Sequence, residues 1–477
     1  MAMYNCSFTK QCVQCIRESI KIIIIFVTIA TSNSNGYSQP NAHWHFGYGA
    51  GLDFSNSQVQ VNIASSMFSS AGSASISDQS GNLLFYTNGV RVWDNSNNIM
   101  LNGLGLLGDS TSRNAAMIVP MPGNDSIYYI FTYGNSKIHY TVVDMSMNGG
   151  LGEVTSTKNI SLTNNADNLL LSVYSSTCEV AWIITRQASS NTFNAFNLSS
   201  SGLSASPIQT SIGTVNGGSN KSGRSSHDGN KIAVPTVTNS PSMGYGVVEI
   251  FDFNKSTGKL SNVISISDIR GPQSVEFSPN NKVLYAVSPG FLDDHLYQWD
   301  ISSNQSSTII QSQFLVDSTN NDNHSDIQLG SDGRIYVSIQ GTSINATIND
   351  SLSIINNPNV IGSGCGFLRN SLSLKGRQCG SSFPRIGFCK YYIGIEEGSH
   401  LRKEEIVLYP NPASDVIFIA STSNNGYYRL ADMRGRIVKM GEYKNKSIPV
   451  YSIRDGNYIL EVSVDGQTKM GRITIRK

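Results

Sequence analysis

A polar turn flanked by short β-prone runs recurs along the first 340 residues at a nearly constant distance. The first copy is Ser75–Trp93 (SISDQSGNLLFYTNGVRVW), whose polar turn, alternating apolar runs and Asn88-Gly89 pair predict β-hairpins. Six equivalent turn positions are recognised: Gly81, Asn124, Thr177, Gly229, Asn281 and Gly333. The intervals between them are 43, 53, 52, 52 and 52 residues.

This period predicts an all-β chain built as a β-propeller. A unit of about 50 residues with three or four short strands cannot bury both faces of its sheet until neighbouring units pack against it. The alternatives are a β-sandwich, which would rarely keep such a period, and a β-helix, whose rungs are much shorter. We expect seven blades, the seventh formed when the strand near Trp44 joins Phe367–Phe388 and leaves no open edge.

The N-terminal residues 1–38 are typical of an export signal peptide. Lys10, Arg17 and Lys21 precede nine apolar residues, Ile22–Ala30, and small residues suit a cleavage site before Gln39. A membrane anchor is the alternative, but nine apolar residues are well short of the roughly 20 that span a bilayer. No later apolar segment is long enough, so the mature chain is expected to lack a transmembrane segment.

The remaining chain is predicted to divide into a propeller (39–392), a linker (393–405) and a small C-terminal β-sandwich (406–477). Charge clusters and apolar periodicity lapses in the linker. In the C-terminal part, short strands are separated by Arg434-Gly435, Asp455-Gly456 and Asp465-Gly466. The whole chain has 34 basic and 33 acidic residues, so nothing in its charge favours nucleic acid as a partner.

Four cysteines remain after removal of the signal peptide: Cys178, Cys365, Cys379 and Cys389. An exported chain permits disulfides, and we expect the pair Cys365–Cys379, with unpaired thiols as the alternative. Zinc is less favoured because the last three cysteines have neither Cys-x-x-Cys spacing nor a nearby His.

No catalytic, cofactor-binding or metal-binding residue is predicted. His43 and His45 share one face of a strand but have no third ligand in reach, so packing is expected. The stretch DSTNNDNHSD, with Asp317, Asp322, His324 and Asp326, is interpreted as a solvated loop rather than a calcium site. Polar loop residues that could face the mouth of a propeller are Asp53, Asp109, Arg113, Asp167, Arg186, Arg270, Asp293 and Asp294. Trp93, Trp182 and Trp299 are expected to pack between blades rather than to stack on sugars.

The C-terminal 72 residues resemble the type A C-terminal sorting domain of the type IX secretion system of Bacteroidota. The resemblance rests on LYPNPASD (408–415), L-x-D-x-x-G-R (430–436), GNYILEV (456–462) and the terminal K-x-x-R-I-x-I (469–475). The matching motif residues are Pro410, Asn411, Pro412, Asp432, Gly435, Arg436, Gly456, Tyr458 and Arg472. The resemblance implies recognition of the tail by the type IX secretion machinery and passage across the outer membrane to a secreted or cell-surface location.

Residues 43–390 are similar to a family of secreted propellers that carry such tails, through WHFGYGAGLDF, MLNGLGLLGDSTSRNAAMIVPMPG and VEFSPNNKVLYAVS. That family implies no common catalytic residues. We therefore expect a non-enzymatic binding or adhesion scaffold for an extracellular glycan or protein. The alternatives are a polysaccharide hydrolase or lyase on a propeller, and a structural component of the cell surface or gliding apparatus.

Overall fold

The computed structural model describes residues 40–56, 58–217, 221–237, 245–289, 294–319, 322–341, 350–387, 406–419, 424–432, 437–464 and 467–477. The predicted signal peptide and linker, Asp293, Cys389, Gly435 and Arg436 lie outside the described residues. The chain separates into two compact units, one spanning Ser38–Tyr392 and the other containing Ile393–Lys477. Each unit is described separately below.

The larger unit consists of antiparallel sheets that follow one another along the chain. A three-stranded closing sheet comes first and contains β1 (His43–Phe46), β2 (Ala50–Asp53) and β3 (Gln60–Asn62). The first blade contains β4 (Ala74–Ser77), β5 (Leu83–Thr87), β6 (Arg91–Asp94) and β7 (Ile99–Leu104). The second contains β8 (Ala116–Pro120), β9 (Ile127–Gly134), β10 (Lys137–Asp144), η1 (Asn148–Gly150), β11 (Glu153–Val154) and β12 (Ile160–Thr163). A short parallel pairing of β7 with β11 joins these two blades into one nine-stranded sheet.

Four further blades repeat the same order. The third contains β13 (Leu170–Tyr174), β14 (Val180–Arg186), β15 (Thr192–Ser199), β16 (Gly202–Leu203) and β17 (Ile208–Ser211). The fourth contains β18 (Arg224–Ser225), β19 (Lys231–Val237), β20 (Tyr245–Asn254) and β21 (Lys259–Arg270). The fifth contains β22 (Ser274–Phe277), β23 (Val283–Ser288), β24 (Asp294–Asp300), α2 (Ser306–Gln311) and β25 (Phe314–Thr319). The sixth contains β26 (Asp322–Leu329), β27 (Ile335–Gly341), β28 (Ser351–Ile355), η2 (Gly362–Cys365) and β29 (Phe367–Ser373).

The sheets close into a ring because every sheet packs against the next. The described residues of this unit contain seven buried apolar clusters, one between each pair of neighbouring sheets. Facing pairs in chain order are Ile76/Ile130, Phe131/Ile183, Trp182/Phe251, Ile250/Trp299, Tyr285/Val337, Tyr336/Trp44 and, at the closing contact, Met67/Tyr86. The closing contact also stacks His45 of the closing sheet on Tyr86 of the first blade, with ring centroids 4.2 Å apart.

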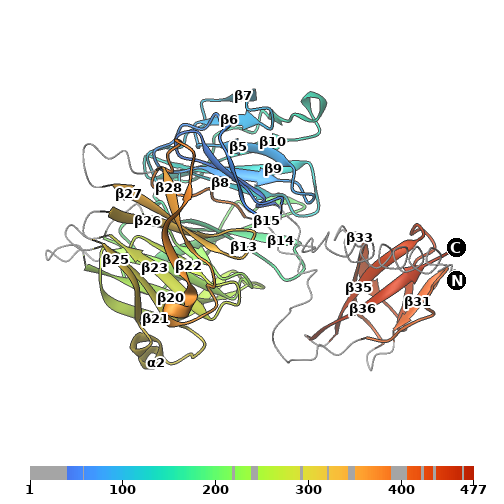
Figure 1. Ribbon diagram of the computed structural model, residues 1–477. Helices are drawn as coiled ribbons and strands as arrows, with labels where there is room; N and C mark the ends of the chain where they lie inside the picture. The colour runs from blue at the N-terminus through green and yellow to red at the C-terminus, as the bar shows by residue number, and fades with distance from the viewer. Residues whose placement is uncertain are drawn as a thin grey trace, which may run out of the picture. The chain divides into compact units, whose positions relative to one another are not determined.

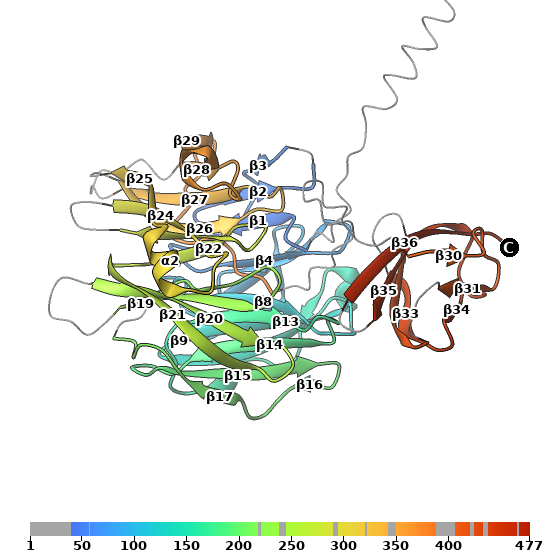
Figure 2. The same ribbon diagram turned by 90° about the horizontal axis from the view of Figure 1, so that it is seen from below.

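The unit is therefore a propeller of six full blades and a three-stranded seventh sheet, as the repeat predicted. In Figure 1 the first strands β8, β13, β22 and β26 lie near the centre and the last strands β7, β21 and β25 lie toward the outside. Figure 2 shows the same ring turned by 90°. All of the tryptophans, Trp44, Trp93, Trp182 and Trp299, are buried between blades, which confirms the packing role predicted for Trp93, Trp182 and Trp299.

The 52-residue period reflects one hairpin turn between the first and second strand of each blade. Asp78, Asp228, Asn280 and Asp332 each accept a backbone N–H two residues later, at 2.8–3.2 Å. The turn residue in the left-handed region is Gly81, Gly229, Asn281 or Gly333 in four blades. In the second and third blades it is Gly123 and Cys178, one residue away from the predicted Asn124 and Thr177.

The way the ring closes differs from the prediction in one respect. Phe367–Ser373, expected in the seventh blade, is the last strand of the sixth blade and pairs with β28. The segment that follows, 378–387, instead runs along the inner edge of the ring and bridges Tyr48, then Ser73, then Ile118. Gly47 allows this close approach, because a Cβ there would lie 2.1 Å from the Gln378 carbonyl oxygen.

The C-terminal unit is a small β-sandwich, as predicted. One sheet contains β30 (Leu408–Tyr409), β31 (Val416–Ile419) and β34 (Ser447–Pro449). The other has the order β33 (Ile437–Tyr443), β32 (Gly426–Asp432), β35 (Gly456–Val464) and β36 (Gln467–Ile475). Alternating residues of both sheets, including Ile417, Leu430, Leu460 and Ile473, form one buried core.

Candidate functional site

A belt of buried polar residues surrounds the propeller axis. It contains Asn114, Asn168, Ser222, Ser274 and Asp326, one from each of five successive blades, at spacings of 54, 54, 52 and 52 residues. Each lies in or just before the first strand of its blade. Periodicity therefore brings residues more than 200 positions apart to one ring.

Hydrogen bonds connect the belt from blade to blade. The Asn114 side-chain amide donates to the carbonyls of Asn168 and Lys221, both at 2.8 Å. Ser222 forms a backbone bridge with Ser274, and the Ser274 hydroxyl donates to the Asp326 carboxylate at 2.5 Å. Because these atoms are shielded from water, each unmade bond would cost more than an exposed one.

The segment 378–387 completes the belt across the ends of the ring. The backbone N–H of Phe383 donates to Asp326 Oδ2 at 2.8 Å. The Ser382 hydroxyl donates to the carbonyls of Ala71 at 2.8 Å and Arg113 at 3.0 Å. The terminal segment thus links the sixth blade to the first and second blades, which closes the ring by polar contacts as well as by apolar packing.

Asp326 is the centre of a buried ion network on this belt. Arg385 of the terminal segment donates through Nη2 to both carboxylate oxygens, at 3.1 and 2.9 Å. Arg224 of β18 lies 3.6 Å from Asp326 and 3.2 Å from Glu276 of β22. Burial raises the pKa of Glu276, although Arg224 and the N–H groups of Leu329 and Phe277 favour its charged form.

The residues that immediately precede the belt carry further charge. Arg113 is buried, and it donates to the Ser325 carbonyl at 2.8 Å, to the Ser381 carbonyl and to the Ser325 hydroxyl at 3.0 Å. Lys221 is half-buried, and burial together with the charge of Arg113 lowers its pKa to about 8. Asp167 forms a buried ion pair with Arg186 at 2.6 Å, so its charge is compensated.

The described parts of the stretch interpreted as a solvated loop belong to β25 and β26, and several of their side chains are buried, which corrects the prediction. His324 on β26 is fully buried, contacts Asp294 through Nδ1 and lies 3.2 Å from Asp317 through Nε2. Arg369 donates to the same Asp317 oxygen at 2.5 Å. Burial lowers the pKa of His324, but Asp294 and Asp317 outweigh it and hold the pKa above its ordinary value. Paired strands and ion pairs therefore replace solvent around these side chains.

The other predicted mouth residues divide between surface and interior. Asp53 lies 3.5 Å from His43, Asp109 caps its own turn by accepting from Thr111, and Arg270 stacks on the Tyr245 ring. Arg113, Asp167, Arg186 and Asp294 are buried. The structure thus brings Arg113 to the belt, whereas sequence reasoning missed Lys221, Glu276 and Arg385. The signal for Lys221 and Glu276 would have been their offset from the belt positions Ser222 and Ser274, whereas Arg385 lies in the terminal segment and has no such offset.

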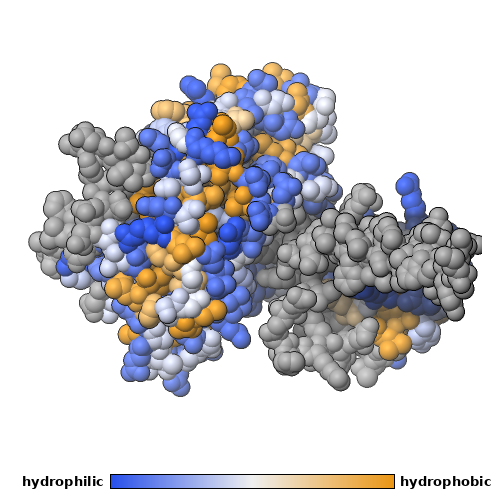
Figure 3. Space-filling view, viewed as in Figure 1, coloured by the Kyte–Doolittle hydropathy of each residue, from blue (hydrophilic) through white to orange (hydrophobic). Residues whose placement is uncertain are grey.

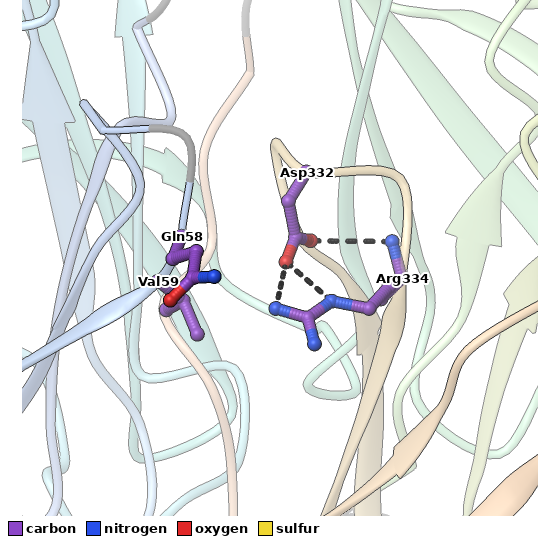
Figure 4. A pocket seen from close by; sticks show the side chains of 4 residues that line it. All are labelled: Gln58, Val59, Asp332 and Arg334. Atoms are coloured by element: carbon purple, nitrogen blue, oxygen red, sulfur yellow. Dashed lines mark hydrogen bonds and ion pairs between the residues drawn. The ribbon is translucent and has the colours of Figure 1, made fainter.

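A surface pocket lies between the closing sheet and the sixth blade. Gln58 and Val59 line one side and Asp332 and Arg334 the other, as Figure 4 shows. Arg334 binds Asp332 through Nε and Nη2, both at 2.7 Å, and its guanidinium lies over the Tyr336 ring. The charged pair is already satisfied internally, so the pocket offers little free charge to a ligand.

The predicted disulfide between Cys365 and Cys379 is wrong in this structure, where both are free, buried thiols. Cys365 packs between the fifth and sixth blades, whereas Cys379 packs between the sixth blade and the closing sheet. The two side chains therefore belong to different interfaces. Cys178 is disulfide-bonded, and its partner lies outside the described residues.

In the C-terminal unit, the motif residue Asn411 joins the first residues of the sandwich to its last strand. The Asn411 side chain donates to the Arg472 carbonyl at 3.2 Å and accepts from the Thr474 N–H at 2.9 Å. Between Pro410 and Pro412, Asn411 thus connects the start of the unit to its last strand, β36. Tyr458 is buried, its hydroxyl donates to the Arg454 carbonyl at 2.7 Å, and a Cβ at Gly456 would contact its ring.

The described residues contain no group of three His, Cys, Asp or Glu side chains placed to hold a metal ion. None of their helices is both long and apolar enough to cross a bilayer.

Comparison with solved structures gives similar β proteins at low identity. They include PorZ, a surface component of the type IX secretion system of Porphyromonas gingivalis (10% identity, 91% of this chain, 75% of that chain, TM-score 0.28). The Dos1 propeller is 12% identical, with 75% of this chain and 91% of that chain covered and a TM-score of 0.38. Hydrazine synthase of Kuenenia stuttgartiensis is 17% identical, with 55% of this chain and 69% of that chain covered and a TM-score of 0.34. These scores carry no argument of their own, and the propeller assignment rests on the strand topology above.

Comparison with protein families gives one match, and it covers the C-terminal unit. Residues 407–476 match the secretion system C-terminal sorting domain. No curated protein sequence matches the chain. The matched range coincides with the sandwich of β30–β36 and includes the motif residues around Asn411 and Arg472. Residues 407–476 therefore belong to the secretion system C-terminal sorting domain family, and the chain is a β-propeller protein that type IX secretion delivers to the cell surface or the medium.

Proposed function

We propose that the mature propeller is a non-enzymatic binding scaffold for an extracellular glycan or protein. The observation that carries this proposal is the state of the acidic side chains at the propeller axis. Asp326, Glu276 and Asp167 are 0%, 2% and 4% exposed, and each is bound to an arginine. A carboxyl group that acts as a general acid or base must reach the substrate, and these three are committed to holding the ring together.

The rigid ring leaves its loops as the variable surface for recognition. Loops carried by a rigid scaffold are the usual location of binding residues in proteins. Apolar side chains are exposed on and after β7, where Leu101, Leu104 and Leu107 are 49–55% exposed. Figure 3 shows apolar surface at the top of the propeller, where Figure 1 places β7. Such surface supports a role in interaction.

The binding proposal is tested with the full mature chain, residues 39–477, on an array of glycans and extracellular polymers. Binding and release of new reducing ends are recorded on the same samples. We expect saturable binding without product release. Product release from a polysaccharide would contradict the proposal and favour the alternative of a hydrolase or lyase.

We also propose that export begins with removal of residues 1–38 and ends with the propeller secreted or retained at the surface. Deletion of 406–477 is expected to leave the propeller in the periplasm, detected by fractionation and immunoblotting. A smaller change, Asn411→Ala, removes the side chain that joins the start of the sorting domain to its last strand, β36. This variant should reduce surface delivery. Normal delivery of the deletion variant would contradict the sorting role, and lasting attachment after tail removal would favour a structural surface component.

A further inference from the structure

Positive charge exceeds negative charge among the described residues at the axis. The belt region holds four basic side chains, Arg113, Lys221, Arg224 and Arg385, but the acids in contact with them are Glu276 and Asp326. Buried charges in proteins are normally paired, because an unpaired one loses its hydration without compensation. We propose that this region is an oxyanion-binding site, with Lys221 as the residue that contacts a carboxylate, sulfate or phosphate group.

The negative charge already present is used by other cations. Asp326 is held by Arg385 at 2.9 Å and lies 3.6 Å from Arg224, and Glu276 is held by Arg224 at 3.2 Å. Arg113 donates hydrogen bonds to neutral oxygens that include those of Ser325, Ser381 and Gln273, while Asp326 acts on it through space. The charge of Asp326 is therefore shared among three arginines, and Lys221 receives no part of it as a contact.

Lys221 itself is poised for a ligand. Its carbonyl is fixed by the Asn114 side chain at 2.8 Å, but the described residues contain no hydrogen-bond acceptor or carboxylate in contact with its ammonium group. Burial and the charge of the neighbouring Arg113 lower the pKa of Lys221 to about 8. Lys221 is half-buried rather than fully enclosed.

Unused hydrogen-bond donors lie on the same belt. The Ser222 hydroxyl, adjacent to Lys221, is buried and has no partner among the described residues. Arg385 is 6% exposed, and its Nε and Nη1 atoms likewise lack partners there. An oxyanion carries negative charge and accepts several hydrogen bonds, and hydrogen bonds to a charged acceptor are stronger than those to a neutral one. Unpaired donors on a belt with excess positive charge therefore match an oxyanion in both respects.

The oxyanion can come from two sources. On an exported propeller, one source is an acidic sugar of a glycan, bearing a uronate or a sulfate ester, and the other is a free inorganic anion. The acidic-sugar source rests on the proposed binding function. The site itself does not, because it is defined by charge and unpaired donors.

The test uses isothermal titration of the full mature chain with sodium sulfate, inorganic phosphate and sodium glucuronate, in chloride buffers of equal ionic strength. Wild-type protein is expected to bind at least one of these anions at one site per chain. Lys221→Met should weaken that binding at least tenfold, and Lys221→Arg, which keeps the charge, should retain it. Lys137→Met, at the exposed start of β10, is the matched control and should bind like wild type.

Tryptophan fluorescence confirms that each variant is folded, because all four tryptophans report on blade packing. Absence of binding by folded wild-type protein, or equal binding by wild type and Lys221→Met, would overturn the oxyanion site. Glycan binding on the array that Lys221→Met leaves unchanged would overturn the acidic-sugar source while leaving the binding function standing. Inorganic anions bound without glucuronate would support the site and identify its ligand as a free anion.

Discussion

Asp326→Asn is predicted to weaken the ring at its closing contact. The carboxylate is fully buried and is shared by the Ser274 hydroxyl, the Phe383 N–H and Arg385, which come from the fifth blade and the terminal segment. Asparagine keeps the shape but removes the negative charge, so the buried guanidinium group of Arg385 loses its counter-ion. Removing one partner of a buried ion pair costs about 3–5 kcal/mol, and we expect a loss of unfolding free energy of that size.

The assay is urea unfolding of the full mature chain followed by tryptophan fluorescence. Because Trp44, Trp93, Trp182 and Trp299 all lie in the propeller, the signal reports on that unit and not on the sorting domain. The control is Asp252→Asn, since Asp252 forms a 2.7 Å ion pair with Lys231 but is 40% exposed. Exposed pairs contribute roughly 0–1 kcal/mol, so this variant should unfold almost like wild type.

A double variant sharpens the test. If Asp326 stabilises the ring through Arg385, then Arg385→Met combined with Asp326→Asn should lose at least about 1 kcal/mol less than the sum of the single variants. A loss below about 1 kcal/mol for Asp326→Asn, or strictly additive losses, would refute the claim that this pair closes the ring.

Two further predictions concern buried groups elsewhere in the propeller. Burial, aided by the charge of His43, lowers the pKa of His45 to about 3. As the pH falls, the unfolded chain therefore binds a proton at this residue first, near pH 6.5. The free energy of unfolding should fall from pH 6.5 toward pH 3 by up to about 1.4 kcal/mol per pH unit. Urea midpoints measured between pH 4 and 7 should show a shallower fall for His45→Phe, which keeps the stack on Tyr86, and equal slopes would contradict this. Alkylation of the unreduced, unfolded mature chain followed by peptide mass spectrometry should modify Cys365 and Cys379 but not Cys178, and a peptide linking Cys365 to Cys379 would contradict the structure.

The repeat was predictable because each blade repeats the same local solution. The side chain of Asp228 or Asp332 stabilises its turn by accepting the N–H two residues later, so the turn can be recognised from a few consecutive residues. The sorting domain was predictable for a similar reason, since its motifs lie in order within 70 residues. Boundaries were less accurate where the local signal was weak, as at Thr177, where Cys178 adopts the left-handed turn conformation.

The candidate site was only partly predictable, because its members share no local pattern. Arg113 was recognised as a polar loop residue, but nothing near it in the chain indicates Ser325 or Ser381 as its partners. Lys221 resembles any surface lysine in sequence. Cys365 and Cys379 are close in sequence, yet packing separates them into different interfaces.

By itself, the sequence determined the blade unit, the number of visible repeats and the sorting domain, because alternating apolar residues and turn chemistry act over a few residues. Tertiary structure alone decided which residue meets which at the axis. The partners of Asp326 are 52, 57 and 59 residues away, and they converge only when the ring closes and segment 378–387 enters its centre. The three-dimensional position of a buried charged group decides whether it has a counter-ion. The excess of positive charge around Lys221 is therefore visible in the structure and not in the sequence.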